Sequence, residues 1–154
     1  MALTTCVCPV FKTALLAMTP HTASDTYKFV LIKPGHSGVY DTTLTAGGTP
    51  GTGTPSTSNI GTDEVAASGS YSSGGITMSG FSASLQGTTG CLDFTIPDVT
   101  SATISAVGGV IVNSSRSNAV VAIMDFGGTI TSTASTFACV EPSVGASTSM
   151  IRFA

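Results

Sequence analysis

The chain has few charged residues for its length. Among 154 residues there are five Lys or Arg and eight Asp or Glu, which gives 8% charge and a formal net charge of -3. Soluble domains usually carry about 25% charged residues. Five scattered basic side chains cannot build a surface that neutralises phosphates, so the composition argues against nucleic-acid binding.

Long apolar runs are also missing. The mean hydropathy is +0.41, yet no window holds the roughly 18 consecutive apolar residues that a membrane-spanning helix needs. The richest run, residues 119–126 (AVVAIMDF), has the length of a strand. Disordered chains combine low hydrophobicity with high charge, whereas 42% of these residues are hydrophobic and few are charged. We therefore expect a folded domain that does not span a membrane.

What the chain has instead is small hydroxyl side chains, with 25 Thr and 21 Ser. A free cytoplasmic protein usually carries dense charge of both signs, which keeps it soluble and prevents association between surface patches. A surface with so little charge favours a protein that is permanently packed against other molecules. The composition thus points to a component of an assembly.

The cysteines are few, and their spacing is not that of a metal or redox site. The Cys6-x-Cys8 pair fits neither a zinc ribbon nor a redox motif. Cys91 and Cys139 lie in strand-like apolar runs, where a reduced cysteine behaves as a small buried hydrophobe. Both histidines, His21 and His36, are distant in sequence from any cysteine pair. We expect no metal and no cofactor.

The start of the chain, MALTTCVCPVF, lacks the positively charged segment of a secretory signal. This argues against secretion by that route. Together with the four cysteines, it favours synthesis in a reducing compartment.

One helix is expected, over residues 9–18 (PVFKTALLAM). Pro9 suits a first helical turn, and Phe11, Leu15 and Met18 recur on one face. Pro20 is expected to end the helix. Two roles stay open for this N-terminal segment, residues 1–20: a helix that caps one end of the domain, or an arm that docks on a neighbouring subunit.

The remainder reads as short strands separated by polar turns. A Gly, Pro, Ser and Thr stretch at 46–61, whose sole apolar anchor is Ile60, predicts an exposed flexible loop.

Gly108-Gly109 predicts a bulge or a close backbone approach, and Gly127-Gly128 is expected to end a strand. The expected strands cover residues 26–33, 76–86, 91–96, 101–112, 119–126, 136–140 and 149–153. Residues 113–118 (NSSRSN) have the composition of a hairpin turn. This pattern predicts one all-β domain over residues 1–154, a sandwich, jelly roll or barrel with one short N-terminal helix.

Residues that could carry out catalysis are sparse. The sequence contains no G-x-S-x-G motif and no phosphate-binding glycine loop between a strand and a helix. The single adjacent acidic pair is Asp63-Glu64. Carboxylates beside turns commonly cap backbone N–H groups, which is the role expected of most of the others: Asp25, Asp41, Asp93, Asp98 and Asp125. No catalytic, cofactor-binding or metal-binding residue is assigned, and the chain is not expected to be an enzyme.

Four segments in the same order resemble a family of small virion proteins encoded among the head genes of tailed bacteriophages. They are residues 11–16 (FKTALL) with 24–32 (SDTYKFVLI), residues 63–75 (DEVAASGSYSSGG), residues 102–128, which end in DFGG, and the close MIRFA at 150–154. The matches span most of the chain. The Cys6-x-Cys8 start and the expanded 46–61 loop depart from the family pattern.

The resemblance implies a capsid decoration or cement protein, which binds the outside of the shell and bridges major capsid protein subunits. Its partners would be the major capsid protein and itself, as a trimer or dimer, with no nucleic acid and no membrane. Its location would be the virion exterior after synthesis in the host bacterial cytoplasm. The helix (residues 11–18) and the 46–61 loop are the candidate contacts.

Alternatives are a head-completion, head-fibre or tail-associated protein and a carbohydrate-binding adhesion module; a small hydrolase is a more remote one. The carbohydrate-binding alternative requires Tyr27, Tyr40 and Tyr71 to line one exposed face, whereas their simpler interpretation is as core or strand-face residues.

Overall fold

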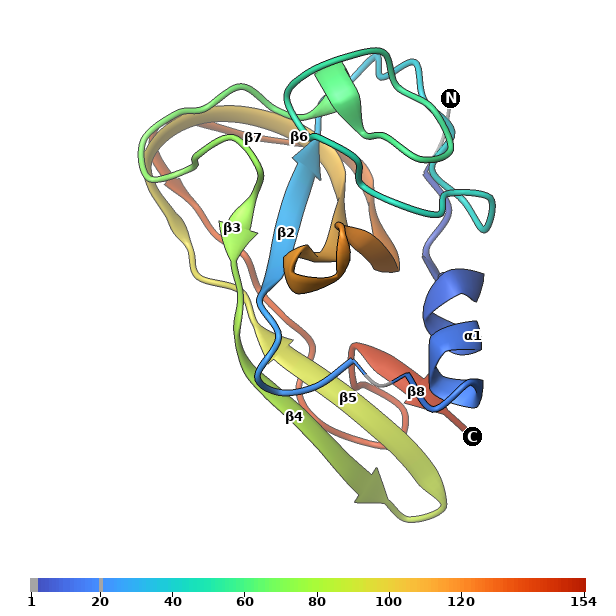
Figure 1. The fold of residues 1–154 in the computed structure, drawn as a ribbon. Helices are drawn as coiled ribbons and strands as arrows, with labels where there is room; N and C mark the ends of the chain where they lie inside the picture. The colour runs from blue at the N-terminus through green and yellow to red at the C-terminus, as the bar shows by residue number, and fades with distance from the viewer. Residues whose placement is uncertain (1–2, 20) are drawn as a thin grey trace.

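The computed structural model describes residues 3–19 and 21–154 and shows an all-β, sandwich-like arrangement with one helix (Figure 1). Its strands form two antiparallel sheets with the orders β1-β7-β6-β2-β3 and β4-β5-β8. The elements are β1 (Cys6–Val7), α1 (Pro9–Leu16), β2 (Tyr27–Ile32), β3 (Ile76–Thr77), β4 (Ser79–Gln86), β5 (Thr89–Thr95), β6 (Val99–Asn113), β7 (Ala119–Phe137) and β8 (Ile151–Phe153), with short 3₁₀ turns η1 (Gly61–Asp63) and η2 (Ser114–Arg116). Both sheets are open, so the sandwich prediction is confirmed and the barrel alternative is wrong.

The large sheet has a hydrophobic core on each face. Along β2, Phe29 and Leu31 belong to the core shared with α1 and the small sheet, whereas Val30 and Ile32 belong to a second core on the opposite face. Side chains alternate between the two faces of a strand, and both faces here are covered. A strand buried on both faces reads as a continuous apolar run, which explains the sequence YKFVLI.

The second core is covered by the chain between β2 and β3. Tyr40, Leu44 and Ile60 come from this connection and are each at most 1% exposed. The 46–61 loop is part of this cover. Its expected exposure is confirmed for residues 51–54 and 56–58 and is wrong for Gly47, Pro50, Ile60 and Gly61, which are buried. The loop lies over the sheet because Ile60 anchors it there.

The β6–β7 hairpin is the longest element and curves around the upper part of the molecule in Figure 1. The predicted turn at 113–118 is confirmed, with η2 at its tip. The predicted irregularity at Gly108-Gly109 is confirmed by a register shift between Ala106 and Gly108.

The expectation that Gly127-Gly128 ends a strand is wrong, because β7 continues to Phe137. Gly108 pairs with Asp125, whereas Ala106 pairs with Ile130. Four residues of β7 therefore lie opposite a single residue of β6. Gly127, with φ of +72°, absorbs this bulge and lets the ladder resume.

The ends of the chain differ from the expected boundaries. The separate strand expected at 136–140 is wrong. Residues 136–137 are the end of β7, residues 138–140 form no strand, and the next strand is β8. The helix α1 ends at Leu16 in a Schellman motif, in which Met18 N–H donates to Leu15 O and Thr19 N–H to Ala14 O. Met18 takes the left-handed conformation, with φ of +52°. Pro20, the expected terminator, lies outside the described residues.

Candidate interaction surface

The buried acidic pair Asp63-Glu64 is held by structural donors. Asp63 accepts hydrogen bonds from Ser37 N–H (3.0 Å), Gly38 N–H (2.7 Å) and Tyr40 O–H (3.0 Å). Burial alone would raise the pKa of Asp63, but these hydrogen bonds outweigh it and hold the pKa below its ordinary value. The ionised carboxylate and its donors fasten the loop that follows β2.

Glu64 points to a different part of the chain. Its Oε1 accepts from Tyr71 O–H (2.8 Å) and Gly74 N–H (2.8 Å), and its Oε2 from Ser73 O–H (3.2 Å). The two neighbouring carboxylates therefore fasten two separate loops. They are not arranged as the facing carboxylate pair that glycoside hydrolysis normally uses.

A third cluster surrounds Asp25, whose carboxylate accepts from Arg116 Nε (2.8 Å), Asn113 Nδ2 (2.8 Å) and Thr22 N–H (3.1 Å). Burial opposes ionisation, yet these bonds lower the pKa of Asp25 well below its ordinary range. The nearby His21 has its pKa lowered by burial and then by Arg116. The cluster joins the segment before β2 to the β6–β7 turn, and it presents no nucleophile.

The other four aspartates accept hydrogen bonds from backbone N–H groups, two of them nearby in sequence and two of them distant. Asp41 caps Thr43 N–H and Asp125 caps Gly127 N–H, as expected. The expectation is wrong for the remaining two: Asp93 accepts from Met150 N–H and Asp98 from Cys139 N–H. Both fasten the C-terminal segment to the small sheet or its border, a role that sequence neighbours could not reveal.

The cysteines are free thiols in the described structure. Cys8 is fully buried at the start of α1, where burial raises the pKa of its thiol strongly. Cys91 is buried as expected, whereas Cys139 is half-buried, and burial raises its pKa to about 11. Within residues 3–19 and 21–154, no three His, Cys, Asp or Glu side chains are grouped so that they could hold a metal ion.

All three tyrosines are buried. Tyr27 is 3% exposed, and Tyr40 and Tyr71 are 1% exposed, which confirms their interpretation as core residues. Their hydroxyl groups bond to Thr22 O, Asp63 and Glu64 respectively. None of them offers a ring face on which a sugar could stack, as the carbohydrate-binding alternative requires.

Exposed apolar side chains gather where α1 meets the small sheet. We name this surface the helix–hairpin groove; its lining includes Phe11, Leu15, Phe81, Leu85, Leu92 and Phe153. Leu85 is 71% exposed, Phe153 41% and Leu15 39%, and the adjacent Leu16 is 85% exposed. Exposed apolar side chains gathered in this way make the groove a candidate interaction surface.

The sequence anticipated only part of this groove. The helix is one of the contacts expected from the sequence. Of the three residues expected on its apolar face, Phe11 is buried, whereas Leu15 and Met18 are exposed. Leu85 and Phe153 were missed, because their alternating strand patterns imply burial. The small sheet extends beyond its neighbours at its β4–β5 end (Figure 1), where Leu85 is 71% exposed.

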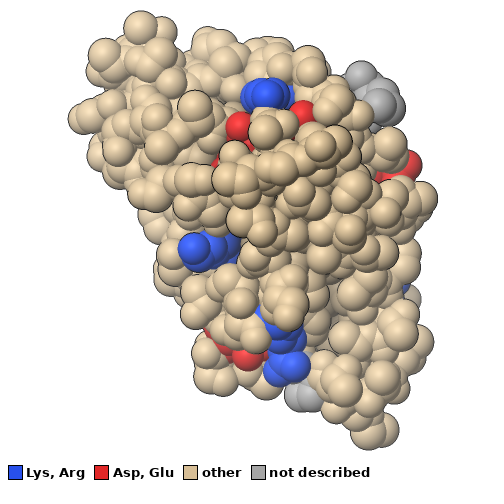
Figure 2. Space-filling view, turned by 45° about the horizontal axis from the view of Figure 1, so that its top comes forward, with Lys and Arg blue, Asp and Glu red and all other residues tan. Residues whose placement is uncertain are grey.

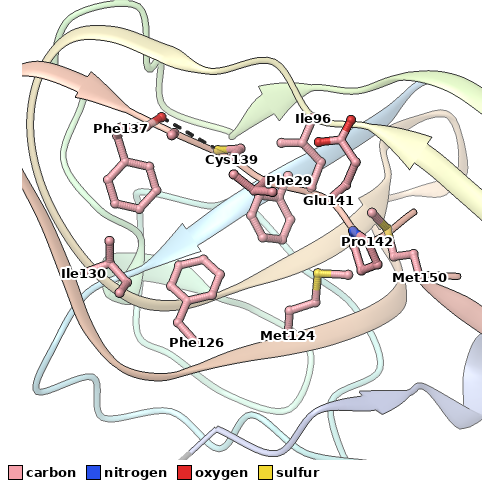
Figure 3. A pocket seen from close by; sticks show the side chains of 12 residues that line it. Phe29, Ile96, Met124, Phe126, Ile130, Phe137, Cys139, Glu141, Pro142 and Met150 are labelled. Carbon is pink, nitrogen blue, oxygen red and sulfur yellow. Dashed lines mark hydrogen bonds between the residues drawn. The ribbon is translucent and has the colours of Figure 1, made fainter. Parts of the chain in front are cut away.

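A second apolar hollow, of about 310 Å³, lies between β7 and the segment after it (Figure 3). The rings of Phe29, Phe126 and Phe137 line it, and the carboxylate of Glu141 is directed away from those rings. Binding pockets normally combine such a lining with a few converging polar groups. With Glu141 turned away, the surface that this hollow offers is mainly apolar.

Charge is sparse around these surfaces. Figure 2 shows Lys, Arg, Asp and Glu as small isolated groups on a largely uncharged face. Along the chain, no charged residue occurs between Glu64 and Asp93, an interval that includes β3, β4 and most of β5. Burying this part of the surface in a complex therefore carries little charge-desolvation cost.

The 46–61 loop, the other candidate contact, is organised by Asn59. Its Oδ1 accepts from Thr49 N–H (2.8 Å) and Gly61 N–H (3.2 Å), and its Nδ2 donates to Thr52 O and Thr54 O (3.2 Å each). One side chain thus bridges both sides of the loop. This bonding favours a single loop conformation, with uncharged hydroxyl groups on its outside.

In the described residues, no helix is both long and apolar enough to cross a membrane. Comparison of the chain with protein-family models, with curated proteins and with solved structures gives no match in any of the three.

Proposed function

We propose that this chain is a structural protein of a tailed-bacteriophage virion, and specifically a decoration or cement protein on the capsid exterior. It binds the outer shell, bridges neighbouring major capsid protein subunits and associates with further copies of itself. It is made in the host bacterial cytoplasm and performs no catalysis.

The observation that carries the proposal is the helix–hairpin groove, an exposed apolar surface beside a stretch of 28 residues, 65–92, without charge. Such a surface is suited to burial against another protein. The carboxylates described above hold loops and segments together, which fits a structural role better than a catalytic one. The viral assignment itself rests on the sequence segments that resemble small phage head proteins.

A cement protein acts by mass action, because a ligand that binds the assembled shell and not its separated subunits stabilises the assembly. Repeated copies on a symmetric lattice add avidity, so each individual contact can be modest. The apolar groove would supply the buried core of each contact. The Ser and Thr hydroxyl groups around it would supply hydrogen bonds at the rim.

The test is to locate the chain on intact particles by cryo-electron microscopy and to measure its copy number relative to the major capsid protein. Many copies spread over the capsid lattice are expected. Copies confined to one vertex or to the tail would instead identify a head-completion, head-fibre or tail-associated protein, and absence from purified particles would overturn the virion assignment.

A further inference from the structure

The small sheet ends in a long strand whose outer edge is unpaired. In the order β4-β5-β8, β4 has β5 on one side and no described strand on the other. It runs for eight residues, Ser79–Gln86, along the rim of the hairpin that extends from the body in Figure 1. Outside the β4–β5 ladder, the hydrogen bonds found among the described residues include none from a β4 backbone group.

The outermost strands at the other sheet edges are short: β1 and β3 have two residues each, and β8 has three. The strand β7 also runs past β1, which pairs only with Ala122 and Ile123, but register shifts in its ladder with β6 interrupt that edge. Proteins commonly protect a long edge with Lys, Pro or an inward-pointing charge. The strand β4 has none of these, because its sequence is SGFSASLQ. A register shift between Ser79 and Ser82 interrupts its first part and leaves Ser82–Gln86 regular.

We infer that this edge pairs with the same edge of a second copy. Two β4 strands, related by a two-fold axis perpendicular to the sheet, would join antiparallel into one six-stranded sheet. The middle of the regular segment is Ser84, so Ser84 would lie opposite Ser84 of the second copy, and Ala83 opposite its Leu85.

The symmetry keeps the apolar faces together. Phe81, Ala83 and Leu85 line the helix–hairpin groove, and a perpendicular two-fold axis leaves this face of both copies on the same side of the joined sheet. Leu85, which is 71% exposed in one copy, would then pack against Ala83 of the other. Directly opposed residues in an antiparallel pair have Cβ atoms about 4.5–5.5 Å apart.

A second copy is the favoured occupant for two reasons. An antiparallel edge complements itself, since each strand offers the same alternation of N–H and C=O groups. Each chain has a net charge of -3, but none of that charge lies in residues 65–92. The paired β4 strands would therefore meet without repulsion between like charges.

Disulfide trapping with the purified full-length chain tests the register. In a Cys91→Ala background, which removes the native thiol opposite Ser84 in the β4–β5 ladder, Ser84→Cys should form a linked dimer under mild oxidation about tenfold faster than Ala83→Cys. Across the two-fold axis only residue 84 faces its own counterpart. The exposed loop variant Ser58→Cys and the unmodified chain, both in the same Cys91→Ala background, are the controls. A Ser84→Cys rate no higher than that of Ser58→Cys would overturn the inference.

A charge variant tests the same edge without relying on thiols. Analytical ultracentrifugation of the wild type should show a dimer that increases with concentration. Ser84→Lys should remove it by placing two like charges opposite each other, whereas Ser58→Lys should leave it unchanged; circular dichroism verifies folding of both. A wild type that stays monomeric at its solubility limit, or a Ser84→Lys dimer as strong as the wild-type dimer, contradicts the proposal. Neither outcome affects the virion assignment, which is tested on particles.

Discussion

The ring of Phe29 on β2 lies directly over the backbone of Gly109 on β6, in the space that a side chain at position 109 would occupy. Phe29 is 2% exposed and belongs to the core between the two sheets. Gly109 is therefore needed because the Phe29 ring of the neighbouring strand packs against its backbone, and not because the chain turns there.

Replacing Gly109 with alanine should destabilise the fold by about 1–3 kcal/mol, the usual cost of overpacking a core. The new Cβ would overlap the Phe29 ring, which must then leave its position. Urea unfolding measures the change. Gly128→Ala is the matched control, because a Cβ there meets no atom within 4 Å, and equal stability of the two variants would contradict this account of the packing.

Asp63 should make stability depend on pH in the acid range. Its folded-state pKa lies below the unfolded value of about 3.9, so its contribution is fully present above that value and is lost as the pH falls through the folded pKa. Asp63→Asn should cost about 1–3 kcal/mol at neutral pH, because the amide nitrogen cannot accept from the donors that surround it.

The measurement is the free energy of unfolding of both proteins between pH 7 and pH 2. The wild type should lose more stability over this range than Asp63→Asn. A residual loss is expected in the variant, since the pKa values of Asp25 and Asp41 are also lowered. Identical pH profiles would show that Asp63 does not contribute in this way.

Asn59 should control the order of the 46–61 loop more than the stability of the whole domain. The variant Asn59→Ala loses four hydrogen bonds to the loop backbone, which lowers the free energy of local opening. Limited proteolysis should cut this loop faster than in the wild type, with a small change in thermal unfolding. Ser58→Ala, at an exposed neighbouring position, should leave the cleavage rate unchanged.

The two sides of α1 should separate folding from binding. Phe11 is 1% exposed, and Phe11→Ala should cost about 3–5 kcal/mol in stability. Leu16 is 85% exposed, so Leu16→Glu should fold normally and, if the groove contacts the capsid, bind particles more weakly.

Val39→Glu provides the control for the surface variant, because Val39 is an exposed apolar residue that lines neither the helix–hairpin groove nor the hollow beside β7. Co-sedimentation with particles lacking the protein measures binding. Equal binding by the Leu16 and Val39 variants would exclude the exposed side of α1 as a contact. Deleting residues 1–18 would not separate the two roles of this segment, because it would also remove Phe11, the buried Cys8 and the strand β1.

The sequence by itself determined the features that depend on local pattern. The run TYKFVLIK predicted a strand and NSSRSN a hairpin turn, both near their observed bounds. The run PVFKTALLAM predicted a helix, which begins where expected and ends two residues early. The low charge also belongs to the sequence alone. These features follow from side-chain periodicity and backbone preference, which act over a few residues.

Only the tertiary structure decided which partner each residue has. The strand β7 continues past Gly127, because its hydrogen bonds with β6 resume beyond the bulge. The tertiary structure also paired Asp93 and Asp98 with the C-terminal segment and left Leu85 and Phe153 exposed beside α1. Periodicity says which side chains share a face, but burial of that face depends on which distant segment covers it. The sequence therefore predicted an all-β domain with few charges, and long-range pairing decided that it is a sandwich and placed its apolar groove and open strand edge.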